Sequence, residues 1–98
     1  MDLKPEHLKI VRDILACHLP GREVKLFGSR ANGRAKPFSD VDLVIMGDEE
    51  LPVRTMRILR DAFEDSDLPF QVDLVEWAGV SEGFRRVIEG SAVALVGP

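Results

Sequence analysis

Two aspartates separated by a single residue are the side chains best placed to do chemistry in this sequence. Asp40 and Asp42 lead into the apolar run of residues 43–46, which predicts a buried strand. Because side chains alternate along a strand, both carboxylates should point to the same face. Two carboxylates crowded on a buried strand repel each other and are poorly solvated, so they need a cation between them. With oxygen ligands and no Cys/His cluster nearby, the cation that this pattern favours is Mg²⁺.

A glycine–serine pair precedes the aspartates and supplies a complementary anion site. Residues 23–27 are predicted to form a strand that ends at Gly28, and ten residues separate Ser29 from Asp40. Gly28 lets a ligand approach the backbone closely, and Ser29 is a good N-cap for a short helix that Gly33 would end. Such a turn leaves backbone N–H groups aimed at an anion. A metal on carboxylates beside this anion site indicates a nucleoside triphosphate bound as its Mg²⁺ complex.

Three cationic residues and a serine lie between the glycine–serine pair and the aspartates. Arg30 is predicted to bind phosphate, because a guanidinium group binds phosphate oxygens in a bidentate way. Arg34 and Lys36 fit either phosphate neutralisation or ordinary solvated loop charge. The hydroxyl of Ser39 could bond a phosphate or hold the local turn, and the sequence leaves both roles open.

The residues GSRANG, followed by SDVDL, resemble the motif of the nucleotidyltransferase superfamily that includes DNA polymerase beta. The sequence is similar to the smallest branch of this superfamily, the minimal nucleotidyltransferase (MNT) domains, and the similarity is strongest over residues 24–46. MNT domains are often paired with a small helical HEPN protein in a toxin–antitoxin system. The resemblance therefore implies transfer of a nucleoside monophosphate, AMP from ATP or the equivalent from another NTP, to an acceptor hydroxyl.

The resemblance also implies roles for individual residues. Asp40 and Asp42 would hold the metal that chelates the triphosphate, and Gly28 and Ser29 would hold its β and γ phosphates. Asp73 would take the place of the family's third carboxylate, which lies in a similar V-D-L context, and would help to hold a second Mg²⁺ that lowers the pKa of the acceptor. An aspartate centred in an apolar strand is unfavourable unless it is paired or bound to metal. The alternative is a hydrogen-bonded aspartate on an edge strand.

The order of elements predicts an α/β fold with a small mixed sheet, as in the polymerase beta palm. A first helix over residues 5–19 is followed by the strand at 23–27, the short helix, a strand leading out of the aspartates, a helix at 52–64, a strand at 70–76 and a helix from Ser81 to Gly90. Residues 92–96 fit a final strand or a packed tail. On the second long helix, Arg57 with Asp61 and Arg60 with Glu64 have the spacing of i,i+4 salt bridges on the outer face, and this pattern favours solvation of the helix over a binding site.

Composition and charge limit the classes of protein to which this chain can belong. Ninety-eight residues with 45% hydrophobic content suit one domain with a single core. A formal net charge of −4 argues against a broad nucleic-acid-binding face. No run is long enough for a membrane span and no signal-peptide pattern is present. The single cysteine cannot form an internal disulfide, so we expect a cytoplasmic protein.

Three functions fit these observations and the resemblance. The first is an antitoxin enzyme that transfers AMP to a HEPN toxin. The second is a non-catalytic antitoxin that binds nucleotide and neutralises its partner by covering it. The third, a small-molecule nucleotidyltransferase of the antibiotic-modifying kind, is disfavoured because nothing in the sequence looks like a drug pocket. The sequence gives neither the nucleobase preference nor the acceptor, and Trp77 fits either core packing or a place beside the base.

Overall fold

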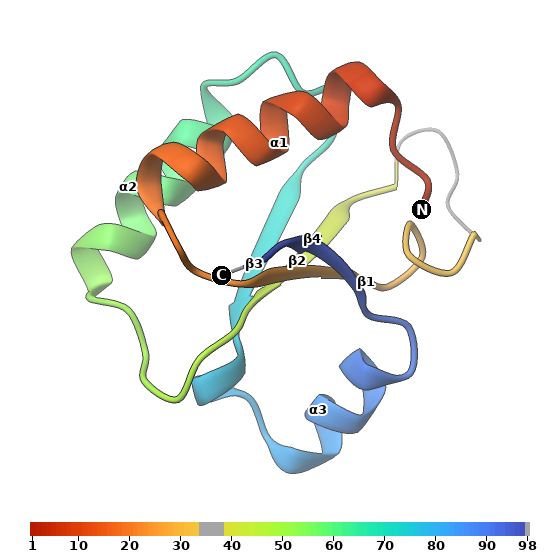
Figure 1. Cartoon of the computed structure of the whole chain (residues 1–98), viewed down its shortest axis with the longest axis vertical. Helices are drawn as coiled ribbons and strands as arrows, with labels where there is room; N and C mark the ends of the chain where they lie inside the picture. Colours follow the sequence, from red (N-terminus) through yellow and green to blue (C-terminus); the bar gives the residue numbers. More distant parts are fainter. Residues whose placement is uncertain (34–38, 98) are drawn as a thin grey trace.

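A four-stranded mixed sheet with helices on both faces forms the protein (Figure 1). The computed structural model describes residues 1–33 and 39–97. The elements are α1 (Pro5–His18), β1 (Val24–Phe27), β2 (Val41–Ile45), α2 (Val53–Glu64), β3 (Val72–Glu76), a single 3₁₀ turn (Trp77–Gly79), α3 (Glu82–Glu89) and β4 (Val93–Val96). Apart from the short helix after the glycine–serine pair, the predicted α/β order is confirmed, and the last apolar residues form a strand rather than a packed tail.

The short helix predicted after the glycine–serine pair is wrong. Residues 29–33 form turns, in which the N–H groups of Ala31 and Asn32 both donate to the Gly28 carbonyl at 3.1 and 3.2 Å. Gly33 has a φ of +78°, a left-handed conformation that stops a helix after this one turn. The positive φ expected at Gly33 is therefore confirmed. Arg34 and Lys36 lie outside the described residues.

The strand order is β3-β2-β1-β4, so β3 and β4 are the two edges of the sheet. β1 runs antiparallel to both β2 and β4, whereas β2 and β3 are parallel and are joined through α2. The register places Asp42 between Phe27 on β1 and Asp73 on β3. Residues far apart in the sequence are thereby brought into one row across the sheet.

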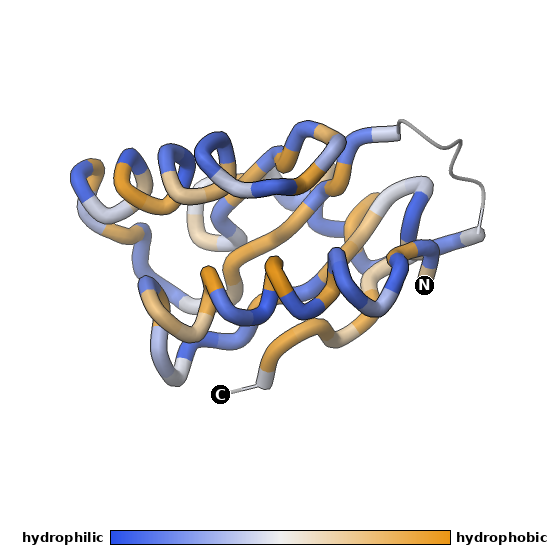
Figure 2. The backbone as a smooth tube through the Cα atoms, turned by 90° about the horizontal axis from the view of Figure 1, so that it is seen from above, coloured by the Kyte–Doolittle hydropathy of each residue, from blue (hydrophilic) through white to orange (hydrophobic). Residues whose placement is uncertain are grey.

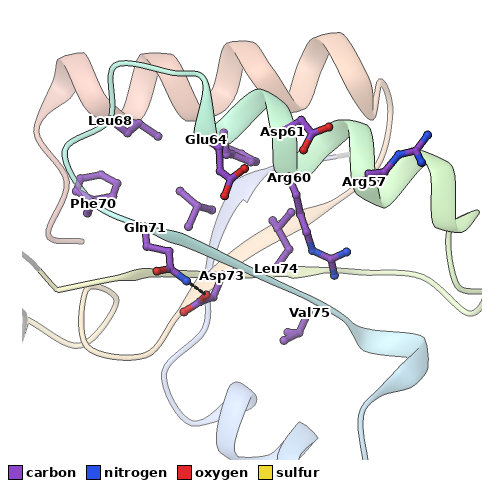
Figure 3. Close-up of a pocket in the computed structure, with 12 residues that line it drawn as sticks. Arg57, Arg60, Asp61, Glu64, Leu68, Phe70, Gln71, Asp73, Leu74 and Val75 are labelled. Atoms are coloured by element: carbon purple, nitrogen blue, oxygen red, sulfur yellow. Dashed lines mark hydrogen bonds between the residues drawn. The ribbon is translucent and has the colours of Figure 1, made fainter.

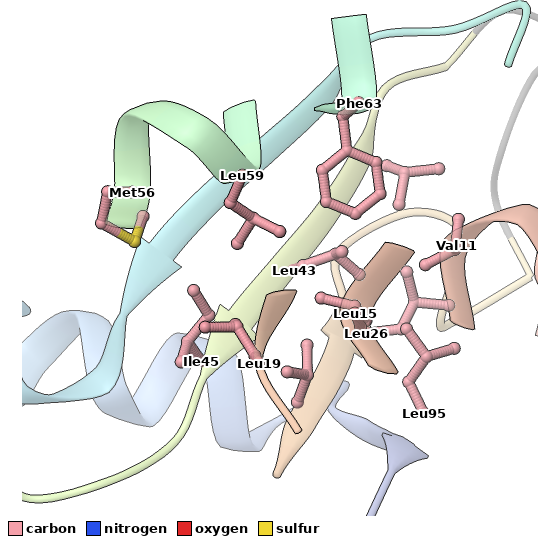
Figure 4. Close-up of a cluster of buried hydrophobic side chains, with 12 residues drawn as sticks. Val11, Leu15, Leu19, Leu26, Leu43, Ile45, Met56, Leu59, Phe63 and Leu95 are labelled. Carbon is pink, nitrogen blue, oxygen red and sulfur yellow. The ribbon is translucent and has the colours of Figure 1, made fainter. Parts of the chain in front are cut away.

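Helices α1 and α2 cover one face of the sheet and enclose the main core (Figure 4). Along both helices, hydrophobic and hydrophilic residues alternate at the spacing of an amphipathic helix (Figure 2). The strands contribute every second residue to this core, as expected for a sheet with one fully covered face. The buried set is Val11, Leu15, Leu19, Val24, Leu26, Val41, Leu43, Ile45, Met56, Leu59, Phe63 and Leu95.

In the part of the chain that the structure describes, α3 and the segments beside it cover the opposite face. Ser81 caps α3, as predicted, by accepting a hydrogen bond from the Phe84 N–H at 3.1 Å. Under this helix lies a smaller cluster in which Phe27, Val44 and Ile88 are buried. Among the helices that the structure describes, none combines the length and apolar character needed to cross a membrane.

Candidate active site

Asp42 and Asp73 occupy matching positions in the adjacent parallel strands β2 and β3. Val41 and Leu43, on either side of Asp42, point into the main core. Because strand side chains alternate, the two carboxylates lie on the other face, the one that α3 covers only in part. Both side chains are half-buried. The aspartates therefore lie side by side where the sheet remains accessible.

Negative charge is concentrated around Asp42. Burial raises the pKa of the Asp42 carboxyl above its ordinary value, and the charges of Asp73 and Asp40 raise it further. Asp40 is exposed and comes just before β2, two residues from Asp42. Electrostatic repulsion among the three carboxylates favours a bound cation or a proton at this position.

Gly28 lies against the carboxylate of Asp42. A Cβ atom at this position would come within 2.5 Å of Asp42 Oδ2, and the φ of Gly28 is +79°. Glycine is therefore required both by the backbone conformation and by the close approach of the carboxylate. The Gly28 N–H donates to Ser91 Oγ at 3.0 Å, so it is already engaged. Sequence reasoning missed Ser91, which lies after α3 and carries no motif.

Ser29 is the member of the glycine–serine pair that remains available to a ligand. It is half-buried and makes no hydrogen bond within the described part of the chain. Because Phe27 pairs with Asp42, the turn at Ser29 begins directly beside the carboxylates. An anion held at Ser29 would lie next to a cation held by Asp42, which is the arrangement that a metal-bound triphosphate needs.

Arg30 is positioned differently from the sequence prediction. Its side chain is buried, with the guanidinium carbon 4.4 Å from the centroid of the Phe70 ring. Its Nε donates to the Ser39 carbonyl at 3.0 Å and its Nη1 to the Asp2 carbonyl at 2.8 Å. The Arg30 carbonyl in turn accepts from the Asp2 N–H at 2.7 Å. This geometry favours a structural role over the predicted phosphate contact.

The contacts of Arg30 connect the two halves of the site. Ser39 directly precedes Asp40, and Arg30 directly follows Ser29. The hydrogen bond from Arg30 to the Ser39 carbonyl therefore fixes the carboxylate segment relative to the glycine–serine turn. For Ser39 itself, this bond supports the turn-holding alternative through its backbone. Sequence reasoning missed Asp2 because its interaction with Arg30 depends on how the chain folds back.

Asp73 lies on an edge strand and accepts a hydrogen bond from Gln71. The Gln71 Nε2 donates to Asp73 Oδ1 at 3.0 Å (Figure 3). This is the geometry of the alternative reading, a hydrogen-bonded edge aspartate. This single hydrogen bond from the Gln71 side-chain amide leaves the second carboxylate oxygen of Asp73 for another partner. A hydrogen bond of this kind can also orient a carboxylate that binds a metal. Both readings of Asp73 thus remain compatible with its position.

The donor set fits Mg²⁺ better than a softer metal. Asp40, Asp42 and Asp73 offer oxygen ligands, and no cysteine or histidine lies with them. Within residues 1–33 and 39–97, no three acidic, histidine or cysteine side chains come close enough to hold an ion by themselves. Mg²⁺ is commonly bound through one or two carboxylates together with substrate phosphates and water. The residues therefore suit an ion that arrives with the triphosphate.

A family model and a curated relative both match nearly the whole chain. The model of the nucleotidyltransferase domain matches residues 5–95. Over 95 residues, the chain is 47% identical to the probable protein adenylyltransferase MntA of Haemophilus influenzae, an alignment that covers 97% of this chain and 83% of that protein.

Solved structures of lower identity share the fold. A toxin–antitoxin structure with AMP-PNP superposes with a TM-score of 0.76 at 23% identity, covering 93% of this chain and 73% of that chain. A tri-AMPylated Shewanella oneidensis HEPN toxin in complex with MNT antitoxin gives a TM-score of 0.68 at 19% identity, covering 93% and 70%. Together with the matched family model and the 47% identical relative, the geometry leads to one assignment: this chain belongs to the nucleotidyltransferase domain family.

Proposed function

We propose that this protein is an antitoxin that transfers AMP from ATP to a hydroxyl group of a HEPN-family toxin and thereby silences it. The observation that carries the proposal is the row formed by Asp42 and Asp73, next to the turn at Gly28 and Ser29. Its 47% identical relative is named a probable protein adenylyltransferase. The choice of a protein acceptor and of AMP follows that relative, whereas the transfer chemistry follows the site and the family.

The residues would divide the reaction between them. Asp40, Asp42 and Asp73 would hold two Mg²⁺ ions, which supply charge neutralisation of the triphosphate and a lowered pKa of the acceptor hydroxyl. Ser29 would bind the β and γ phosphates beside Gly28. The acceptor oxygen forms a bond to the α-phosphorus, the bond to the β-phosphate oxygen breaks, pyrophosphate leaves, and the hydroxyl proton passes to water. The protein contributes mainly orientation and placement of charge.

The direct test uses a HEPN-family protein as the acceptor. The two proteins are incubated with ATP and Mg²⁺, and the HEPN protein is examined by mass spectrometry. We expect AMP adducts with wild type, and none with Asp42→Asn. The matched control is Asp48→Asn, which removes the same charge from an exposed loop and should leave transfer intact. An unmodified HEPN protein in cells that are nevertheless protected would favour the non-catalytic antitoxin.

The metal requirement has its own test. Because the carboxylates repel one another without a cation, we expect ATP to bind with Mg²⁺ and barely to bind in EDTA. Calorimetric titration under the two conditions measures this difference. Equal affinities would remove the metal from the proposal. We further propose that the protein acts as a single domain in the cytoplasm, where ATP is available.

A further inference from the structure

Strand β3 presents an open edge right beside Asp73. In the part of the chain that the structure describes, β3 pairs only with β2, and all five of its residues are half-buried. The Val41 N–H donates to the Gln71 carbonyl at 2.9 Å. In a parallel ladder, alternate residues direct their backbone groups to opposite sides. The N–H and C=O groups of Val72 and Leu74 therefore point away from the sheet.

This edge lacks the usual protection. Proteins commonly blunt an edge strand with proline, lysine or a covering segment. The strand reads VDLVE and contains neither proline nor lysine. Its Asp73 points to the face of the sheet, and the Glu76 carboxylate accepts a hydrogen bond from the Leu51 N–H at 2.7 Å. Within residues 1–33 and 39–97, no segment pairs with the outward backbone groups of β3, so they can pair with an added strand.

A groove runs along the edge between β3 and α2. Its volume is about 850 Å³, and Asp73 lies on its lining (Figure 3). The α2 side of this groove, here called the α2–β3 groove, carries Arg57, Arg60, Asp61 and Glu64. In Figure 3 the Arg60 side chain extends toward Leu74, so its guanidinium group lies close to β3.

Neither arginine of the groove forms a salt bridge with an acidic side chain of the described residues. The predicted salt bridges from Arg57 to Asp61 and from Arg60 to Glu64 are wrong, because the ion pair found among residues 1–33 and 39–97 joins Lys9 to Asp13. Both arginines are exposed. Exposed i,i+4 pairs contribute only tenths of a kcal/mol, so an external carboxylate can compete for these groups.

We propose that the acceptor protein adds an extended segment to the β3 edge, with an acidic side chain paired to Arg57 and Arg60. This inference rests on the proposed function and specifies how its acceptor is held. Backbone hydrogen bonds to Val72 and Leu74 supply affinity. The two arginines, which lie beside Asp61 and Glu64 on α2 without forming salt bridges to them, bind the acidic side chain of the segment. A hydroxyl-bearing residue of the segment, on the same face of the extended sheet as Asp73, lies next to the catalytic carboxylates.

The first test reverses the charge of the groove. Arg57→Glu with Arg60→Glu should raise the KM for the acceptor at least about tenfold, because like charges now face each other. The kcat at saturating acceptor and the affinity for ATP should stay unchanged, since neither arginine belongs to the nucleotide site. The matched control is Arg54→Glu with Arg86→Glu, two exposed helix positions outside the groove. An unchanged KM in the groove variant would overturn the proposal.

The second test reads the backbone without a mutation. Residue-resolved hydrogen exchange should show the amides of Val72 and Leu74 exchanging quickly in the free protein and slowly in the complex. The amides of Asp73 and Val75, which face β2, should be slow in both. A complex that transfers AMP without protecting the amides of Val72 and Leu74 would contradict the docking of the acceptor at β3 but not the proposed function. Protection that grows with the concentration of this protein by itself would assign the edge to a second copy.

The two proposals fail in different ways. Absence of AMP on the acceptor with the wild-type protein contradicts the proposed function. Transfer by wild type, combined with an unchanged acceptor KM in the groove variant, leaves that function standing and removes only the docking edge. A melting temperature matching wild type in both double variants ensures that a change in KM reflects docking rather than unfolding.

Discussion

The two faces of the sheet are built from alternate residues of the same strands, yet they meet opposite requirements. On β2, Val41, Leu43 and Ile45 are almost fully buried against α1 and α2, whereas Asp42 lies between them on the other face. The covered face stabilises the fold by removing apolar surface from water. The partly covered face concentrates carboxylates that repel one another. The comparison shows that burial on one face of the sheet stabilises the fold enough to offset the electrostatic repulsion among carboxylates on the other face.

The largest effect is expected when the covered face is weakened. Leu43→Ala should lower the free energy of unfolding by about 2–5 kcal/mol, because it leaves a cavity where the side chain is fully buried. Denaturant unfolding measures this loss. The control is Ile58→Ala, whose side chain is 40% exposed and should cost far less. Similar losses for the two variants would contradict the assignment of Leu43 to the core.

The next effect concerns chemistry on the open face. Asp73→Asn should retain most ATP binding and still form the partner complex, but lose transfer by at least about 10–100-fold, because it removes the ligand that we propose for the second metal. Mass spectrometry of the toxin, beside toxin rescue in growing cells, measures this. The opposite result is full rescue by the variant with no nucleotidylated toxin in wild-type cells. That result would make the protein a covering antitoxin.

A smaller effect is expected where the two halves of the site are joined. Arg30→Lys keeps the charge but loses the planar group that reaches both the Asp2 and Ser39 carbonyls. Losing part of this buried arrangement should lower the free energy of unfolding by about 1–3 kcal/mol. Thermal unfolding measures it, with ATP affinity as the companion measurement. Reduced ATP affinity at an unchanged melting temperature would restore the phosphate role predicted from the sequence.

The smallest effect on stability is expected when the charge repulsion around Asp42 is removed. The pKa of Asp42 is raised in the folded state, so its contribution to stability is present at low pH and is lost as the pH rises through the folded pKa. Asp42→Asn should therefore raise the melting temperature of the metal-free protein at pH 7. This advantage should vanish below the ordinary carboxyl pKa. A lower melting temperature at neutral pH would show that the carboxylate is favourably paired instead.

Local patterns predicted most of the fold and part of the site. Alternation along β2 and β3 was enough to place Val41 and Leu43 in the core and to put the aspartates on the opposite face. These predictions succeed because burial of a whole strand face involves far more energy than any single polar contact. The predicted roles of Asp40, Asp42 and Asp73 in binding metal remain predictions.

The parts that sequence reasoning missed depend on distant partners or on weak preferences. Ser91 binds the Gly28 N–H across 63 positions of chain, and no local pattern marks such a pair. Arg30 has the sequence context of a phosphate ligand, but Asp2 and Phe70 hold it. The salt bridges expected on α2 failed for another reason, because pairs worth tenths of a kcal/mol do not decide a side-chain conformation.

The hydrogen bonds between Asp2 and Arg30 have a practical consequence for how this protein is produced. They make the first residues of the chain part of the framework that holds the segment before Asp40. An affinity tag joined next to Asp2, or a protease that removes Asp2, would therefore disturb the contacts that position Ser39 rather than a dispensable tail. A tag placed after β4 avoids this contact, and preparations tagged at opposite ends should differ in activity before they differ in fold.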